Sequence, residues 1–358
     1  MNTTSDTATN AIDRPMPRSR DSEPVIAAHA APFASWTSPD VPPAGYYPPQ
    51  QLADAAQFYR DNGFVVMTAG LAQQEVSELG SETARLCRGD RGDIAGRRNT
   101  PGVTMVAADV SDSEVMRQFL CIHFPHKLSS AMYDTLALPN IVNLLTRIIG
   151  PNIKTMQSML FIKASGKPGQ AWHQDEYFIP TRDRSLGAAW MALDDATVEN
   201  GCLWVIPGSH KSGLIWPQHS HQDRRFDCTG EAINFPYTDA DAVPVEVKAG
   251  SIVFFNGYLL HRSLPNYASG GFRRSLVNHY MSAESLLPWM QPRDGETMGT
   301  LDYRDIVMVA GKDPYAWKGL EQRATAHVRP SGEGGCGDPR LNSKPVMAVE
   351  DDDDDDDD

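Results

Sequence analysis

The residues with the clearest chemical potential are His173 and Asp175, which lie two apart in the run AWHQDEY over 171–177. Aromatic and apolar neighbours predict a strand here, and residues two apart on a strand point to the same side. We therefore expect the imidazole and the carboxylate to face one point. A second histidine would complete a 2-His-1-carboxylate set, which binds iron on one side and leaves three adjacent positions open.

The same His-Gln-Asp tripeptide occurs again at His221 and Asp223. Metal ligands must be held on rigid elements with supporting contacts. Residues 211–245 are polar and show little strand pattern, so we interpret His221 as part of a solvated loop and place the metal at the first tripeptide. Long irregular segments in compact domains are usually functional. This segment and the helices between 72 and 150 are therefore our candidates for the substrate wall or lid.

His261 is the predicted third ligand. It follows Asp175 by 86 residues, after a glycine turn, a buried strand at 251–255 and a second small turn. That separation leaves room for the intervening strands of a β-roll. On its own, such a histidine is as often a hydrogen-bonded core residue. The prediction therefore depends on the order of all the motifs together.

An arginine pair follows His261 after a further twelve residues, in the run Arg273-Arg274-Ser275. On a strand, Arg273 and Ser275 share a face, and Arg274 points the opposite way. A guanidinium fork beside a hydroxyl suits the distal carboxylate of a dicarboxylic co-substrate. Arg274 is expected to form a surface ion pair instead.

The elements that must position these residues are mostly short strands. Apolar runs separated by Gly and Pro turns are found at 158–163, 188–193, 202–206, 251–255 and 275–280. Two helices are expected before them, one over 50–60 that ends near Gly63 and one over 73–86. Helices that precede the strands, rather than alternating with them, favour a mainly β fold with flanking helices: a sandwich, barrel or jelly roll.

We expect four regions along the chain. A disordered N-terminal extension covers 1–42, because it is rich in polar residues and proline. One folded domain covers 43–310, a C-terminal extension covers 311–345, and a disordered acidic tail covers 346–358.

Composition excludes several function classes. The formal net charge is -14, and nine of the negative charges lie in 350–358. The remaining mildly acidic body has no basic face for nucleic acid, and no apolar run approaches the ~20 residues that span a bilayer. Five cysteines without a C-x-x-C pair fit a reducing compartment. We expect a cytoplasmic protein with no nucleic-acid or membrane partner; the oligomeric state stays open.

Several segments together resemble the phytanoyl-CoA dioxygenase family of Fe(II)- and 2-oxoglutarate-dependent oxygenases. The resemblance covers about 50–285, and the run at 199–211 is its most specific part. The segments that carry it are FYRDNGFVV (58–66), SMLFIK (158–163) with HQD (173–175), WMALDD (190–195), ENGCLWVIPGSHK (199–211), HRS (261–263) and FRRS (272–275).

This resemblance implies a double-stranded β-helix, also called a jelly roll or cupin-like core, within 43–310. It implies that His173, Asp175 and His261 bind Fe(II), and that Arg273 pairs with the far carboxylate of 2-oxoglutarate. By the same analogy, further residues line the co-substrate pocket, and His210 is structural rather than a ligand. These further pocket residues are Ser275, Gln157, Lys163 and Trp190.

The implied reaction uses O2 and 2-oxoglutarate, hydroxylates an unactivated C–H bond of a small-molecule substrate, and releases succinate and CO2. Halogenases of similar fold replace the carboxylate with a small residue, so the presence of Asp175 favours hydroxylation. Two rival interpretations stay open. One is a non-catalytic metal-binding jelly-roll protein, and the other is a zinc-dependent hydrolase on the same ligands, which would have no use for Arg273.

Overall fold

The computed structural model describes residues 43–96, 109–227, 230–287 and 305–329, so the predicted extension over 1–42 and the acidic tail over 346–358 lie outside it. Within these residues, two β-sheets face each other. The main sheet has the order β1-β2-β11-β6-β13-β4-β3-β15, with β14 beside β4, and a smaller sheet has the order β10-β7-β12-β5. Neighbouring strands are antiparallel, except that β1 and β2 run parallel.

The strands of the main sheet are β1 (Tyr46–Tyr47), β2 (Phe64–Met67), β3 (Cys121–His123), β4 (Ile153–Ala164), β6 (Gly187–Ala192), β11 (Ile252–Asn256), β13 (Phe272–Ser282), β14 (Val307–Ala310) and β15 (His327–Arg329). The smaller sheet consists of β5 (Gln170–His173), β7 (Leu203–Val205), β10 (Val243–Val245) and β12 (His261–Ser263). A separate two-stranded pair is formed by β8 (Gln218–His219) and β9 (Glu231–Ala232).

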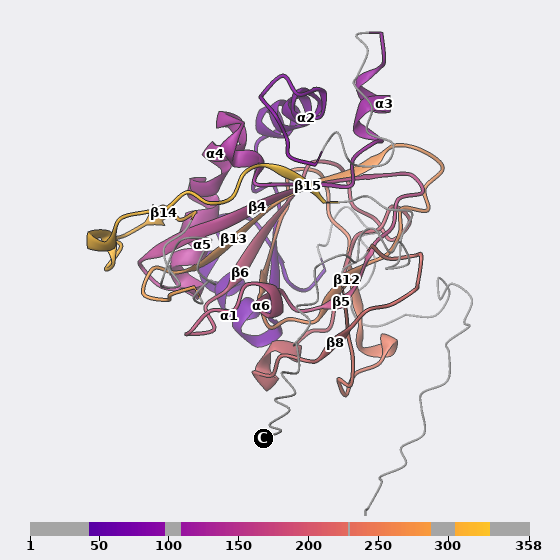
Figure 1. Cartoon of the computed structure of the whole chain (residues 1–358). Coiled ribbons are helices and arrows are strands. Elements are labelled where there is room, and N and C mark those ends of the chain that lie inside the picture. The colour runs from indigo at the N-terminus through magenta and orange to yellow at the C-terminus, as the bar shows by residue number, and fades with distance from the viewer. Residues whose placement is uncertain (1–42, 97–108, 228–229, 288–304, 330–358) are drawn as a thin grey trace, which may run out of the picture.

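The longer helices cover the outer face of the main sheet, while the smaller sheet lies beyond its inner face (Figure 1). The helices are α1 (Leu52–Asn62), α2 (Gln73–Arg88), α3 (Asp112–Met116), α4 (Ser130–Asp134), α5 (Pro139–Ile148) and α6 (Asp175–Phe178). None of the helices in the described ranges has the length and hydrophobicity that crossing a membrane requires.

Strand β2 illustrates why the main sheet is apolar on both faces. Val65 and Met67 pack into the core that includes the helices, whereas Phe64 and Val66 pack into the core between the two sheets. Alternate residues of a strand point to opposite faces, so a strand buried on both sides reads as a continuous apolar run. The same alternation places every second residue of β4 and β13 between the sheets.

The transition from α1 to β2 is made by a single glycine. Gly63 has φ 81°, and its N–H donates to the Tyr59 carbonyl at 2.7 Å, which ends the helix. This left-handed backbone favours glycine because it has no Cβ. The predicted helix end at Gly63 is therefore confirmed, and the strand that follows enters the sheet directly.

The mainly β architecture with flanking helices, a jelly roll of two facing sheets, is confirmed. The predicted run at 158–163 is the second half of β4, and the run at 275–280 is the central part of β13; these strands extend over 12 and 11 residues. Beyond residue 310, the described part of the chain includes β15, which pairs with β3 at the edge of the main sheet.

Candidate metal centre and its cavity

His173, Asp175 and His261 come together at one end of the smaller sheet. Their ligand atoms all lie within 4.8 Å of one another, and this is the one such group of three found in the described residues. His173 ends β5 and His261 begins β12, and the two face each other as a cross-strand pair. Asp175 Oδ1 lies 3.6 Å from Nε2 of each histidine. This separation is too long for hydrogen bonds, and it leaves space for one metal ion between the three ligand atoms.

Asp175 does not lie on a strand, so that part of the prediction is wrong. Strand β5 ends at His173, and Asp175 is the first residue of helix α6. The intervening Gln174 has an extended backbone, with φ -126° and ψ 130°, so His173 and Asp175 still face one side. The amide of Gln174 is held by the carbonyls of Leu214 and Tyr258, to which it donates at 2.9 and 2.7 Å.

Backbone carbonyls orient both imidazoles. His173 Nδ1 lies 2.8 Å from the Ala171 carbonyl, and His261 Nδ1 lies 3.0 Å from the Leu259 carbonyl. Because a carbonyl only accepts, each Nδ1 carries the proton, and each Nε2 presents a lone pair towards Asp175. Burial and the nearby His261 lower the pKa of His173 to about 4, so this imidazole is neutral at neutral pH.

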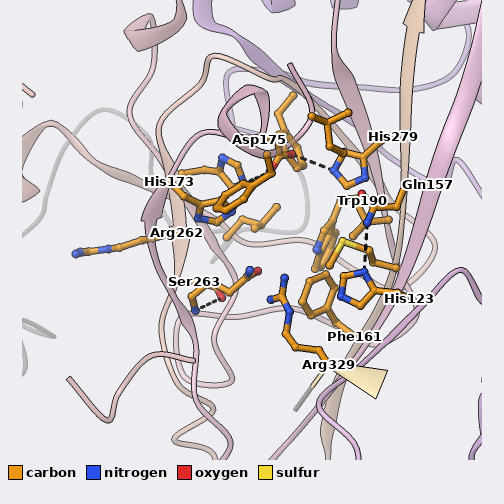
Figure 2. A pocket seen from close by; sticks show the side chains of 18 of the residues that line it. His123, Gln157, Phe161, His173, Asp175, Trp190, Arg262, Ser263, His279 and Arg329 are labelled. Atoms are coloured by element: carbon orange, nitrogen blue, oxygen red, sulfur yellow. Dashed lines mark hydrogen bonds and ion pairs between the residues drawn. The ribbon is translucent and has the colours of Figure 1, made fainter. Parts of the chain in front are cut away.

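A third histidine, His279 on β13, orients the carboxylate. Its Nε2 lies 3.1 Å from Asp175 Oδ2, which leaves Oδ1 facing the two ligand imidazoles (Figure 2). Burial opposes ionisation of Asp175, but His261, His279 and His173 outweigh it and hold the pKa of Asp175 well below its usual range. No motif in the sequence points to His279. It reaches Asp175 because β13 crosses the main sheet opposite the smaller one.

These donors fit a ferrous ion. Two neutral imidazole nitrogens and one carboxylate oxygen, all on one side, form the set typical of non-haem Fe(II) oxygenases. The hydrogen bonds to the far atoms of each ligand hold the three groups in this arrangement. The opposite side of the triad faces a cavity of about 220 Å³ between the two sheets.

Three of the residues expected at the co-substrate line this cavity: Gln157, Trp190 and Arg273. The guanidinium of Arg273 is buried, its centre lies 5.5 Å from the Trp190 ring centroid, and its Nη1 donates to Ser275 Oγ at 3.0 Å. Within the described residues it forms no ion pair, and Nε has no partner. Burial lowers the pKa of Arg273 to about 10, so the charge remains and suits an anionic ligand.

Two expected residues do not line the cavity. Ser275 lies behind Arg273 and accepts its hydrogen bond. Lys163 is buried, and its Nζ donates to Ser263 Oγ, the Leu264 carbonyl and the Gly201 carbonyl at 2.9, 2.7 and 3.3 Å. Burial lowers the pKa of Lys163 well below its usual value. The lysine therefore ties β4 to the loop after β12 instead of facing the cavity.

The predicted substrate wall or lid, formed by 211–245 and the helices between 72 and 150, stays a prediction, although its described parts do not line this cavity. None of the cavity-lining residues belongs to segment 211–245 or to helices α2 to α5. The lining comes from the strands of both sheets, from α6 and the residue after it, and from Arg329 at the end of β15. Sequence reasoning missed Arg329 and His123, because only the pairing of β15 with β3 and of β3 with β4 brings them here.

The second His-Gln-Asp tripeptide forms no metal site in the described residues. His221 is buried rather than solvated, 7% exposed, and it packs against Phe226. Asp223 binds Arg225 through Nη2 at 2.6 Å and Nε at 2.9 Å. His210 is not among the cavity-lining residues, and its Nε2 lies 3.1 Å from the Arg60 carbonyl.

Arg274 forms the expected ion pair, but partly buried. Its Nη2 and Nε each donate to a carboxylate oxygen of Asp194, at 2.7 and 2.8 Å. The Asp194 carboxylate also accepts from the Arg274 backbone N–H at 2.7 Å. Neighbouring arginines on one strand therefore have different partners, because alternate residues face opposite sides of the sheet.

Known proteins share both the sequence pattern and the fold. A family profile described as Phytanoyl-CoA dioxygenase (PhyH) matches residues 59–275. A phytanoyl-CoA dioxygenase of Arabidopsis thaliana is 42% identical over 120 residues, which cover 32% of this chain and 40% of that protein. Phytanoyl-CoA dioxygenase 1 of Oryza sativa subsp. japonica is 30% identical over 279 residues, covering 70% of this chain and 96% of that one.

The fold is also found in a solved structure of the epimerase SnoN in complex with Fe3+, alpha ketoglutarate and nogalamycin RO. It superposes with a TM-score of 0.51 at 21% identity, over 74% of this chain and 98% of that chain. The matched range 59–275 contains the triad and Arg273. The chain therefore belongs to the phytanoyl-CoA dioxygenase family and is a non-haem iron dioxygenase that uses Fe(II), 2-oxoglutarate and O2.

Proposed function

We propose that this enzyme hydroxylates an unactivated C–H bond of a small-molecule substrate and releases succinate and CO2, with His173, Asp175 and His261 as the iron ligands. The observation that carries the proposal is the convergence of two Nε2 atoms and one carboxylate oxygen beside a cavity that also holds a buried guanidinium without an ion pair. Bound iron, with 2-oxoglutarate and O2, supplies an oxidant that breaks such C–H bonds.

The chain's own groups prepare this chemistry. Arg273 pairs with the far carboxylate of 2-oxoglutarate in a water-poor setting, where a charge-assisted and bidentate bond is strong. Trp190 and Phe255 also line the cavity, and their apolar surfaces exclude water from the reacting groups. Asp175 occupies the third ligand position, which favours hydroxylation over transfer of a halide.

The first test compares metals. Protein loaded with Fe(II) is expected to consume 2-oxoglutarate and O2 and to form succinate, slowly without substrate, whereas Zn(II)-loaded protein forms none. Hydrolysis of ester or amide substrates by the zinc form alone would favour the hydrolase instead. Metal binding without any 2-oxoglutarate binding would favour a non-catalytic protein.

The second test uses two neighbouring arginines. Arg273→Gln is expected to raise the 2-oxoglutarate concentration at half saturation by about 10- to 100-fold, because it removes a charge-assisted pair worth ~1.5–3 kcal/mol. Arg274→Gln is the matched control, since Arg274 binds Asp194 on the other side of the sheet. Calorimetric titration of the Fe(II) protein with 2-oxoglutarate, under anaerobic conditions, measures both. Equal shifts in the two variants would remove Arg273 from the co-substrate site.

A further inference from the structure

A second arginine, Arg329, faces the cavity from β15, the edge strand of the main sheet next to β3. Arg329 ends β15, and its side chain points into the space between the sheets, next to Phe161 (Figure 2). Strand pairing places it in one row with Cys121, Phe161 and Ser275. Three strand spacings of ~4.8 Å separate β15 from β13, on the order of 14 Å. Arg329 and Arg273 therefore enter the cavity from different strands, with two strands between them.

The guanidinium of Arg329 has donors to spare. Its Nη1 donates to Asp227 Oδ2 at 2.8 Å, and the Asp227 side chain is buried. Burial opposes the charge, but Asp227 outweighs this effect and raises the pKa of Arg329. A guanidinium carries five N–H donors in a flat fork, and the side chain stays 22% exposed. One edge is thus anchored to Asp227, while the rest faces the cavity.

The other two cationic side chains that line the cavity, Arg273 and Arg262, have other partners. Arg273 belongs to 2-oxoglutarate under the proposed function. Arg262 points away from the cavity in Figure 2, with its guanidinium centre 4.5 Å from the Trp172 ring centroid and Nη1 3.1 Å from Asp239 Oδ1. Among the described lining residues, Arg329 is thus the cation left to meet a substrate, and Asp175 is the one carboxylate.

The surface between Arg329 and the triad is apolar with a neutral polar rim. Phe161, whose ring centroid is 5.9 Å from the Arg329 guanidinium centre, and Met159 lie on β4. Phe178 packs edge-on against His173, with ring centroids 6.2 Å apart. His123 lines the same wall, and burial with the nearby Arg329 lowers its pKa to about 2, so it carries no charge. The cavity thus offers an anion site, an apolar path and the metal centre.

We propose that Arg329 binds an anionic group of the substrate, a carboxylate or a phosphoryl group, while an apolar part of the substrate lies along Phe161 and Met159 towards the triad. This inference deepens the proposed function and rests on it for the position of the reacting carbon. Anchoring one end of the substrate at β15 would set which carbon reaches the metal centre, since Arg329 is fixed to the main sheet and the two histidines of the triad are fixed to the smaller sheet that faces it.

Three probes of equal chain length test the anion site: octanoate, octyl phosphate and octan-1-ol. They are titrated calorimetrically into Fe(II) protein saturated with 2-oxoglutarate under anaerobic conditions, so that Arg273 is occupied. Wild-type protein is expected to bind at least one anion about tenfold or more tightly than the alcohol. Comparison of octanoate with octyl phosphate identifies which oxyanion fits.

Arg329→Gln is expected to abolish the preference for anions, and Arg329→Lys to retain part of it. Arg225→Gln is the matched control, because Arg225 also pairs with an aspartate, Asp223, but lies outside the cavity lining. It is expected to keep the full preference. If Arg329→Gln fails to fold, the lysine variant and the Asp227 variant carry the test.

The variant Asp227→Asn distinguishes two roles of Arg329: binding the substrate, or only holding two segments of the fold together through its ion pair with Asp227. Removing this carboxylate frees the guanidinium, so anion affinity is expected to stay equal or rise. If Arg329 had only the structural role, Asp227→Asn and Arg329→Gln would both lose affinity for the anionic probes, and that result would overturn the proposal. Equal affinity of wild type for all three probes, or a raised 2-oxoglutarate requirement in Arg329→Gln, would also overturn it. Failure of the oxygenase proposal would show separately, as absent succinate formation by wild type.

Discussion

The chain contains the tripeptide His-Gln-Asp twice, and the two copies differ in everything except sequence. At His173 and Asp175, a strand end and a helix start present both side chains to His261 on the neighbouring strand. At His221 and Asp223, no second histidine converges within the described residues. The comparison teaches that strands brought alongside a motif, rather than the motif itself, make a metal site.

The two carboxylates also have different partners. Asp223 is paired with Arg225, a permanent cation that neutralises it. Asp175 is surrounded by His173, His261 and His279, and imidazoles lose their protons readily when a metal competes for the nitrogen. Only the arrangement around Asp175 leaves a carboxylate oxygen available to a metal ion.

The largest expected effect is the loss of activity when a ligand is removed from the first copy. His173→Ala is expected to lower succinate formation at least about 10³-fold, equivalent to ~4 kcal/mol, because the iron loses an imidazole. His221→Ala is expected to keep activity within about threefold, although it leaves a small buried cavity. Iron content per chain, measured alongside succinate, shows whether activity is lost because the variant binds less iron. Full activity in His173→Ala would remove this histidine from the site.

Metal removal is expected to have the next largest effect. Saturating Fe(II) at 100 times its dissociation constant would stabilise the folded protein by ~2.7 kcal/mol, so chelation should lower the thermal midpoint. His221→Ala should show the same shift as wild type, and His173→Ala a much smaller one. Scanning calorimetry with and without chelator measures the shift. If the thermal midpoint of the wild type were the same with and without chelator, His173, Asp175 and His261 would not bind one metal ion together.

A smaller effect is expected when the partner of each carboxylate is removed. His279→Ala should weaken iron binding by about 10- to 100-fold, since groups that orient ligands typically contribute this much. Arg225→Gln, which removes the partner of Asp223, should leave iron binding unchanged. Titration with Fe(II) under anaerobic conditions compares the two. If His279→Gln, which retains a donor, restores most of the affinity, the role is orientation of Asp175.

The smallest expected effect is on stability at the second copy. Asp223→Asn breaks a half-exposed ion pair with Arg225, and such pairs contribute at most about 1 kcal/mol. Activity and iron content should stay at the wild-type level. Urea unfolding measures the stability difference. A fall in iron content in this variant would mean that the second tripeptide takes part in metal binding.

The features that the sequence predicted well are those carried by local patterns. The apolar runs between Gly and Pro turns indicated β4 and β13, and the order His173, Asp175, His261 and Arg273 indicated residues that the structure brings to one cavity. The predicted strand at Asp175 was wrong, because four residues can form a helical turn without changing the direction set by the extended Gln174.

The features that the sequence missed depend on sheet register. His279 and Arg329 reach the cavity because β13 pairs with β4, β4 with β3, and β3 with β15. No spacing along the chain encodes such a row, since each pairing joins distant segments. The burial of His221 was missed for the same reason, because its polar neighbours along the chain do not reveal what packs over it.

Strand β15 has a consequence for how the enzyme comes into being on the ribosome. The triad and Arg273 are all synthesised by residue 273, whereas the wall that carries Arg329 emerges more than fifty residues later. Chains are made from the N-terminus, and a domain generally folds as a unit. A nascent chain that already carries its proposed iron ligands can thus complete the substrate compartment only after β15 has also left the ribosome.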